Sequence, residues 1–145
     1  MFQYDNSNFP LVKVKLIGDL SNDDEFNQFL NDWLTLYENQ NDFTFLFDTL
    51  EVRNPPLKYC IKMANFIKKL RKREYQYLQE SIILINNNKI KWMLEFIFLI
   101  APPVARVYIF NINDDSNIDI NNLDDIKNSS NSIIIESGKP LLPIF

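Results

Sequence analysis

The chain has 145 residues, the usual length of one domain, and its net charge is −4. It contains no histidine, only two glycines and a single cysteine. These counts exclude a His general base, His-ligated zinc, a glycine-rich phosphate loop, an internal disulfide and a multi-cysteine metal site.

The first predicted elements are a strand and an acidic helix. Apolar and polar residues alternate over residues 11–17, which predicts a strand with one solvated face that ends at Gly18-Asp19. Ser21 is placed to cap a helix over residues 22–38, and the acids after it suit a helix N-terminus. The apolar residues of this helix recur at helical spacing: Phe26, Phe29, Leu30, Trp33 and Tyr37.

A buried strand and a basic helix follow. Residues 43–47 are nearly all apolar, as in a central strand covered on both faces, and Asp48 closes this strand. The sequence Asn54-Pro55-Pro56 predicts a helix start in which Asn54 is the capping residue. The helix extends to residue 73, and its basic face lies opposite its apolar stripe: Lys58, Lys62, Lys69 and Arg73.

The remaining predicted elements continue the alternation. Residues 81–85 predict another buried strand, and residues 89–100 predict an unusually apolar helix. Pro102-Pro103 stops that helix, and residues 104–110 predict the last strand. Strands that alternate with helical crossovers indicate a parallel sheet.

This order predicts a two-layer α/β domain over residues 1–110. We expect a mostly parallel sheet of four to five strands with helices packed against it, and residues 2–9 can add an edge strand. Residues 111–145 form an acidic, Asn-rich C-terminal segment that we expect to be flexible up to residue 132. Its apolar end either folds back on the domain or serves as a linear docking motif.

The sequence also predicts a compartment. No cationic and apolar secretory signal opens the chain, and the apolar stretch over residues 92–105 is interrupted and short of the ~20 residues that span a bilayer. We therefore expect a reduced, cytoplasmic protein. The abundance of Asn and Ile is typical of an AT-rich coding genome.

The run from Val12 to Leu20, with the helix after it and the later sequence Phe45-Leu46-Phe47-Asp48, resembles the opening of a STAS domain. This is the sulfate-transporter and anti-sigma-factor-antagonist family. The resemblance covers residues 11–110 and rests on element order together with Gly18, Asp19 and Asp48. It implies an α/β fold and a role in protein interaction. The lipid carriers of the SEC14 type are a more remote resemblance, by topology alone.

One family motif is missing from this chain. In the bacterial antagonists, an Asp-Ser-Ser-Gly-like loop before the second helix carries a serine that a partner kinase phosphorylates. The matching positions here are Pro56, Leu57, Lys58 and Tyr59, and residues 50–79 contain neither Ser nor Thr. The resemblance therefore does not extend to a serine phosphoswitch at that helix start.

The basic face is the first candidate binding site. Residues 53–73 contain eight basic side chains and no acid, whereas residues 16–52 contain nine acids and no base. Lys58, Lys62, Lys69 and Arg73 would hold an acidic protein, anionic lipid headgroups or nucleic acid. Nucleic acid is the least favoured of these, because the pI is about 4.8. The alternative is a solvated helix face that the acidic first helix balances.

The apolar helix over residues 89–100 is the second candidate. A helix that is apolar on every side is either buried or meets an apolar partner. Some of the side chains of Trp92, Phe96, Leu99 and Ile100 would then be exposed to a protein partner, to a second copy of the chain in a homodimer, or to an interfacial lipid layer. The alternative is that residues 141–145 cover this helix as a lid.

Acidic residues at strand ends and the cysteine are weaker candidates. Asp19 and Asp48 would form a carboxylate pair if both ended parallel strands, although such residues more often cap turns. Cys60 lies on the apolar stripe, and we expect it to be a small buried hydrophobic residue. An enzyme is therefore our third hypothesis, after the two binding functions.

The sequence favours a non-catalytic cytoplasmic interaction module without cofactor or metal. We expect it to dock an acidic protein through Asn54, the basic face, Trp92 and Phe96. The alternative function is binding to anionic lipid at a membrane surface.

Overall fold

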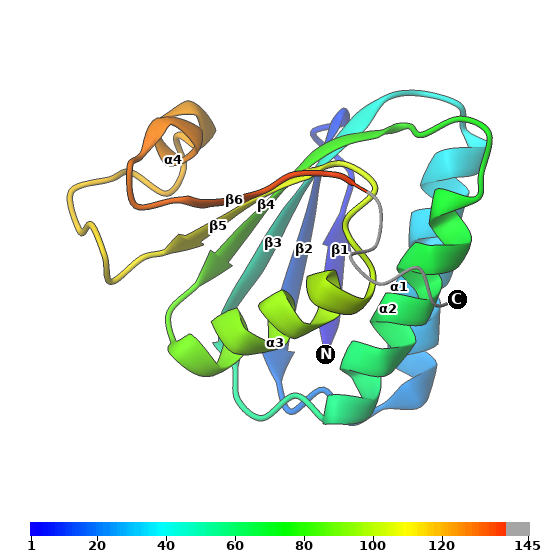
Figure 1. Ribbon diagram of the computed structural model, residues 1–145, viewed down its shortest axis with the longest axis horizontal. Coiled ribbons are helices and arrows are strands. Elements are labelled where there is room, and N and C mark those ends of the chain that lie inside the picture. Colours follow the sequence, from blue (N-terminus) through cyan, green and yellow to red (C-terminus); the bar gives the residue numbers. More distant parts are fainter. Residues whose placement is uncertain (139–145) are drawn as a thin grey trace.

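The computed structural model describes residues 1–138, which form one six-stranded sheet with four helices (Figure 1). The strands are β1 (Phe2–Asp5), β2 (Leu11–Gly18), β3 (Phe43–Val52), β4 (Leu78–Ile85), β5 (Arg106–Asn111) and β6 (Ile133–Ile135). The helices are α1 (Asp23–Glu38), α2 (Leu57–Arg71), α3 (Asn88–Ile100) and α4 (Leu123–Asn128).

The sheet is mixed, which corrects the expected mostly parallel sheet of four to five strands. The strands lie in chain order, and β2, β3, β4 and β5 are parallel to one another. An antiparallel strand flanks them on each edge, β1 beside β2 and β6 beside β5. The edge strand β6 was missed because three residues are too short for a period-two pattern.

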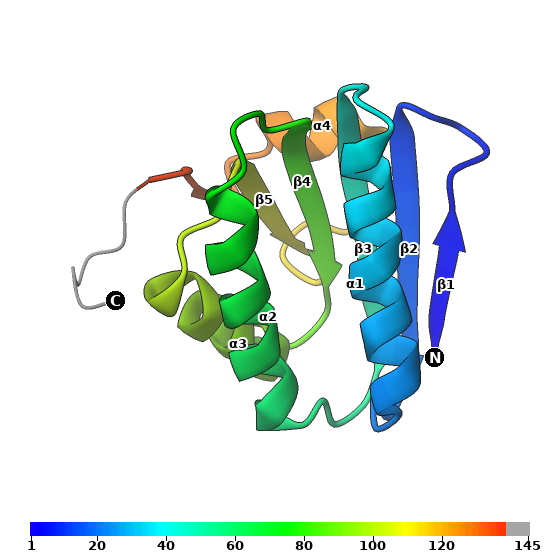
Figure 2. The same ribbon diagram turned by 90° about the vertical axis from the view of Figure 1, so that its right-hand side faces the viewer.

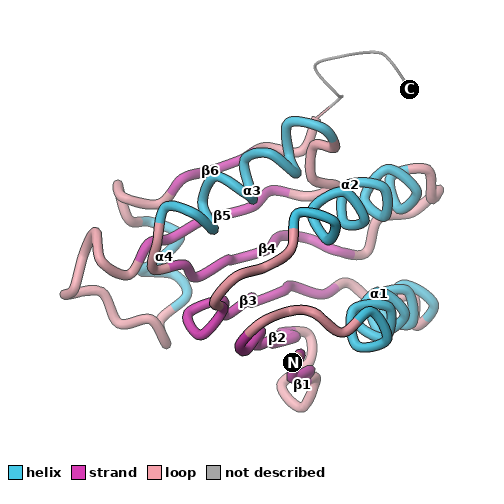
Figure 3. The backbone as a smooth tube through the Cα atoms, turned by 90° about the horizontal axis from the view of Figure 1, so that it is seen from below, coloured by secondary structure: helices cyan, strands magenta, loops and turns pink. Residues whose placement is uncertain are grey.

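Helices α1, α2 and α3 cover one face of the sheet. Figures 2 and 3 show the three helices in a single layer, with α2 between α1 and α3. This arrangement follows from the topology, because right-handed crossovers between parallel strands in chain order all pass over the same face. The outer sides of α2 and α3 therefore form one continuous helical surface.

The core between the sheet and the helices is strongly aromatic. Phe45 of β3 is fully buried, and the Trp33 ring of α1 meets it edge-on at 4.8 Å between ring centroids. The ring of Phe66 of α2 also contacts Trp33, with 5.1 Å between ring centroids. Helices α2 and α3 pack on each other where Cys60 and Ala64 of α2 meet Ile97 of α3, with Ala101 directly after α3.

The opposite face of the sheet is partly covered by the segment that we expected to be flexible. Ile126 of α4 is fully buried against Ile82, Leu84, Tyr108 and Phe110. Figure 2 shows α4 on the far side of the sheet from α1 and α2. The polar composition of residues 111–132 hid these few apolar anchors. Residues 141–145, which were the alternative lid over α3, lie outside the described part of the chain.

Two helix starts differ from the sequence prediction. Asn22, not Ser21, caps α1, because its Oδ1 accepts the backbone N–H groups of Asp24 and Glu25 at 2.9 and 3.1 Å. Helix α2 begins at Leu57, so Asn54 does not cap it. The reason is the second proline, which disfavours helical geometry in Pro55 before it.

Strand β3 extends beyond Asp48, where we expected it to end. Lys15 pairs with Asp48 but Ile17 pairs with Glu51, so β3 contains an irregularity that adds one residue. The Asp48 carboxylate accepts the Leu50 N–H at 2.9 Å inside this irregularity. Gly18 ends β2 with a φ of 74°, a backbone conformation that glycine adopts without strain.

Candidate functional site

The loop before α2 is tied to α3. The side-chain oxygen of Asn54 accepts a 3.3 Å hydrogen bond from Nζ of Lys89, in the first turn of α3. Asn54 is exposed, and the two prolines after it are half-buried. The predicted docking residue Asn54 therefore links two helix starts on one edge of the helical layer.

The first part of the basic face is partly neutralised by α1. Nζ of Lys58 lies 3.1 Å and Nζ of Lys62 lies 3.7 Å from Oδ1 of Asp23. The Tyr59 hydroxyl donates a hydrogen bond to the same oxygen. The hydrogen bonds from Tyr59 and then Lys58 lower the pKa of Asp23. The single carboxylate of Asp23 thus pairs with two lysines. The group formed by Asp23, Lys58 and Lys62, which we call the junction of α1 and α2, therefore keeps a net positive charge.

Lys69 and Arg73 of the basic face, and the neighbouring Arg71, are held in three different ways. The Arg71 guanidinium donates to the carbonyl oxygens of Pro102 and Pro103, which fastens α2 to the chain after α3. Arg73 lies over the ring of Tyr37, 6.0 Å from its centroid. Lys69 is exposed and forms no ion pair with the rest of residues 1–138. Lys69 therefore presents its full charge to solvent.

Helix α3 exposes a row of large apolar side chains. Trp92 is 66% exposed, Phe96 37% and Leu99 57%. Their spacing of four and three residues places them on one side of the helix, away from the buried Ile90 and Ile97. Two further exposed apolar residues, Leu57 and Ile61, lie on the neighbouring helix α2. We call these five residues the apolar row.

The acidic strand-end candidates are not brought together. Asp48 lies within β3, in register with Lys15, whereas Asp19 follows the end of β2. Asp19 forms a 3.9 Å ion pair with Arg53 instead. Within the described part of the chain, no three His, Cys, Asp or Glu residues are grouped closely enough to hold a metal ion.

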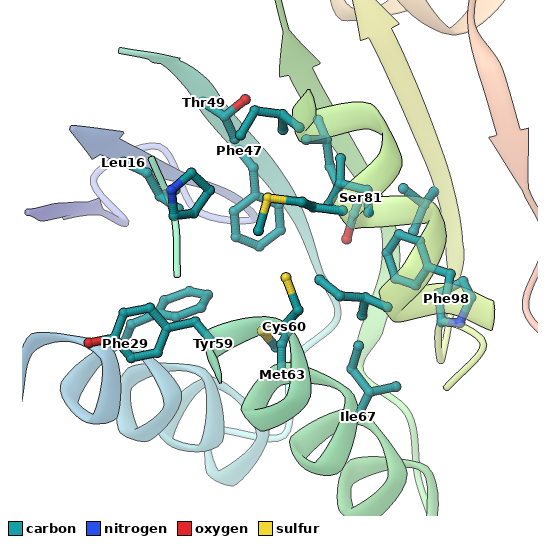
Figure 4. A pocket seen from close by; sticks show the side chains of 18 of the residues that line it. Leu16, Phe29, Phe47, Thr49, Tyr59, Cys60, Met63, Ile67, Ser81 and Phe98 are labelled. Atoms are coloured by element: carbon teal, nitrogen blue, oxygen red, sulfur yellow. The ribbon is translucent and has the colours of Figure 1, made fainter. Parts of the chain in front are cut away.

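A cavity of about 170 Å³ lies between the sheet and helices α1 to α3. Figure 4 shows Phe47 and Ser81 on the sheet side, with Cys60 and Met63 of α2 opposite them. The lining is almost entirely apolar, and none of its described residues is charged. Burial raises the pKa of the Cys60 thiol, which keeps it protonated.

The few polar groups around this cavity differ in their partners. The Thr49 hydroxyl donates a 2.7 Å hydrogen bond to the Leu84 carbonyl. Ser81 is only 4% exposed, and its hydroxyl makes no hydrogen bond within residues 1–138. The buried indole N–H of Trp33 also has no acceptor there.

Sequence reasoning missed this cavity. The one sequence feature that could have indicated the cavity was Ser81. It is a polar residue on the helix-facing side of a strand, and the next four residues of that strand are apolar. The volume itself comes from how the aromatic rings of three elements pack, and no pattern along the chain encodes that.

No helix within residues 1–138 is both long enough and apolar enough to cross a membrane. No protein-family model, curated protein or solved structure matches the sequence or the fold.

Proposed function

We propose that this chain is a non-catalytic interaction module, similar to a STAS domain, that docks an acidic protein on the outer surface of α2 and α3. The observation that carries this proposal is the apolar row, in which Trp92 of α3 is two-thirds exposed, together with the basic face on the neighbouring helix α2. Exposed aromatic residues of this size mark interaction sites more often than single exposed leucines do.

The chemistry of this surface favours a protein with an acidic rim. Trp92 and Phe96 offer a central apolar contact of the kind that dominates binding energy. Lys69 and the lysine pair at Asp23 lie on the adjacent helix, where they would meet carboxylates at the edge of the interface. Such rim charges speed association and make it sensitive to salt.

The docking surface has no serine or threonine hydroxyl that a kinase could modify at the start of α2. Residues 50–79 contain no Ser or Thr, and the nearest one before them, Thr49, is buried and bonded to a backbone carbonyl. We therefore expect partner binding that does not depend on phosphorylation of this helix start.

Reconstitution of a captured partner tests the proposal. The partner is isolated from cells that express the chain, identified, purified and titrated against one contact variant and one charge variant. We expect Trp92→Ala to weaken its binding at least about tenfold, because a central aromatic contact is lost. Lys69→Glu should weaken it several-fold, more at low salt than at high salt.

Matched controls stand on other surfaces. Ile134→Ala removes an apolar side chain that is 48% exposed on β6, and Lys13→Glu reverses an exposed charge on β2. Neither should change the affinity. An affinity that Trp92→Ala leaves unchanged would contradict the proposed surface. So would controls that weaken binding as much as Trp92→Ala does.

Anionic lipid is the other candidate for this surface, because Trp and Lys together also suit a membrane interface. Vesicles with and without phosphatidylserine distinguish the two. Binding to the anionic vesicles that Trp92→Ala abolishes, without any reconstituted protein partner, would replace the protein by the membrane surface.

A further inference from the structure

The cavity under α2 is separate from the docking surface and has the size of a ligand site. Its volume is about 170 Å³, and its lining combines aromatic, aliphatic and sulfur-containing side chains. An apolar protein cavity of about 150 Å³ stays dry and takes up benzene. A molecule of about one aromatic ring therefore fits this space.

Ser81 gives the cavity a specific polar feature. Its side chain is 96% buried, since its exposed fraction is 4%, and its hydroxyl has no partner among residues 1–138. Figure 4 shows Ser81 directed into the space between β4 and α2. Ser81 is not among the fully enclosed polar atoms without a partner, so its hydroxyl is open to a molecule in the cavity. A polar atom of a bound molecule would gain a hydrogen bond there that the described chain does not supply.

We propose that this cavity binds a small uncharged molecule of about one aromatic ring, and that the single hydroxyl or carbonyl group of this molecule bonds to Ser81. The apolar body of the ligand would lie against Phe47 and Met63, which line the cavity.

The lining also decides against a charged ligand. None of the described lining residues is an Asp, Glu, Lys or Arg, so an ion would lose its hydration without gaining a countercharge. The Cys60 thiol does not supply one, because burial raises its pKa.

Two probes that differ by one hydroxyl group test the proposal, p-cresol and toluene. The chain has three methionines, of which Met63 and Met93 line the cavity and Met1 is exposed. With carbon-13 labelled methionine methyl groups, we expect both probes to shift the NMR signals of Met63 and Met93 and to leave that of Met1 unchanged. Unchanged Met63 and Met93 signals up to the solubility limit of both probes would overturn the inference.

Paired hydroxyl deletions test the role of Ser81. We expect p-cresol to bind tighter than toluene, and Ser81→Ala to reduce this preference about fivefold or more, the usual effect of one neutral hydrogen bond. Thr49→Val is the matched control, because the Thr49 hydroxyl is already bonded to Leu84. A preference that survives Ser81→Ala, or that Thr49→Val removes equally, contradicts the assignment of Ser81.

A variant whose larger side chain fills the cavity tests whether the probes bind at this site. Cys60→Leu adds side-chain volume within the cavity, so it should abolish the methionine shifts while the protein stays folded. Persistent shifts in this variant would place the probes elsewhere and overturn the site. Trp92→Ala should leave p-cresol binding unchanged, so failure of the ligand site and failure of the docking surface are distinguished.

Discussion

The Tyr59 hydroxyl donates a 2.7 Å hydrogen bond to Oδ1 of Asp23, which joins the first turn of α2 to the first turn of α1. Lys58 and Lys62 approach the same carboxylate. Burial, with the hydrogen bond to Asp23 as a second cause, raises the pKa of Tyr59 to about 12. This junction fixes the basic face relative to the acidic helix, so it determines how much positive charge the docking surface keeps.

Loss of the Asp23 charge should destabilise the fold in a pH-dependent way. Because folding lowers the pKa of Asp23, its charge stabilises the folded chain above the unfolded pKa of about 3.9. That contribution is lost as the pH falls through the lower folded pKa. We expect Asp23→Asn to lower Tm at pH 7 and the difference from wild type to shrink below about pH 3.9.

Thermal unfolding between pH 2 and pH 8 measures this effect. Asp24→Asn is the matched control, since Asp24 follows Asp23 in the same turn but its carboxylate holds neither Tyr59 nor the two lysines. A Tm difference for Asp23→Asn that stays constant over the whole range would mean that the charge of Asp23 does not stabilise the junction.

Replacement of Arg71 should loosen the connection between α2 and the chain after α3. Its Nη2 donates to two carbonyl oxygens, those of Pro102 and Pro103, and the shorter lysine side chain does not place its ammonium at the same position. We expect Arg71→Lys to lower the free energy of unfolding by about 1–2 kcal/mol. Urea unfolding measures it.

Arg73→Lys serves as the comparison for Arg71. Arg73 is exposed and lies 6.0 Å from the centroid of the Tyr37 ring, so its replacement should cost less than about 0.5 kcal/mol. Equal losses in the two variants would argue against a structural role for the two proline carbonyls.

Truncation of Ile126 tests whether the C-terminal segment is part of the folded unit. This side chain is fully buried on the far face of the sheet, so Ile126→Ala should lower the free energy of unfolding by about 2–5 kcal/mol. Ile134→Ala, at a residue that is 48% exposed, should cost less than about 0.5 kcal/mol. Chemical unfolding that shows no loss for Ile126→Ala would mean that α4 contributes nothing to stability.

The sequence predicted the central elements well because their patterns are long and regular. The strand that starts at Leu11 and the helix that ends at Glu38 agree with the structure within a few residues. The start of α2 was wrong because the effect of Pro56 on Pro55 outweighs the capping preference of Asn54. The end of β3 was wrong because an irregularity lets the strand continue past Asp48.

Features formed by distant residues were harder to predict. Charge segregation predicted a basic face, but it did not indicate that Asp23 would hold both Lys58 and Lys62, because that depends on how α1 and α2 lie together. The apolar pattern of α3 did not indicate which of its side chains would be exposed, because the 66% exposure of Trp92 depends on how α3 packs on the sheet. The alternative cover, residues 141–145, lies outside the described residues. The position of Ser81 inside a cavity likewise depends on tertiary structure.

Site-specific photocrosslinking at position 92 tests the proposed docking surface most directly. A photoreactive phenylalanine analogue replaces Trp92 in cells that express the chain, and the same analogue at Ile134 is the control. We predict one discrete adduct with another, acidic protein at position 92, which Lys69→Glu diminishes, and no such adduct at position 134. An adduct with a second copy of the chain, with lipid alone, or of equal yield at both positions would contradict the account.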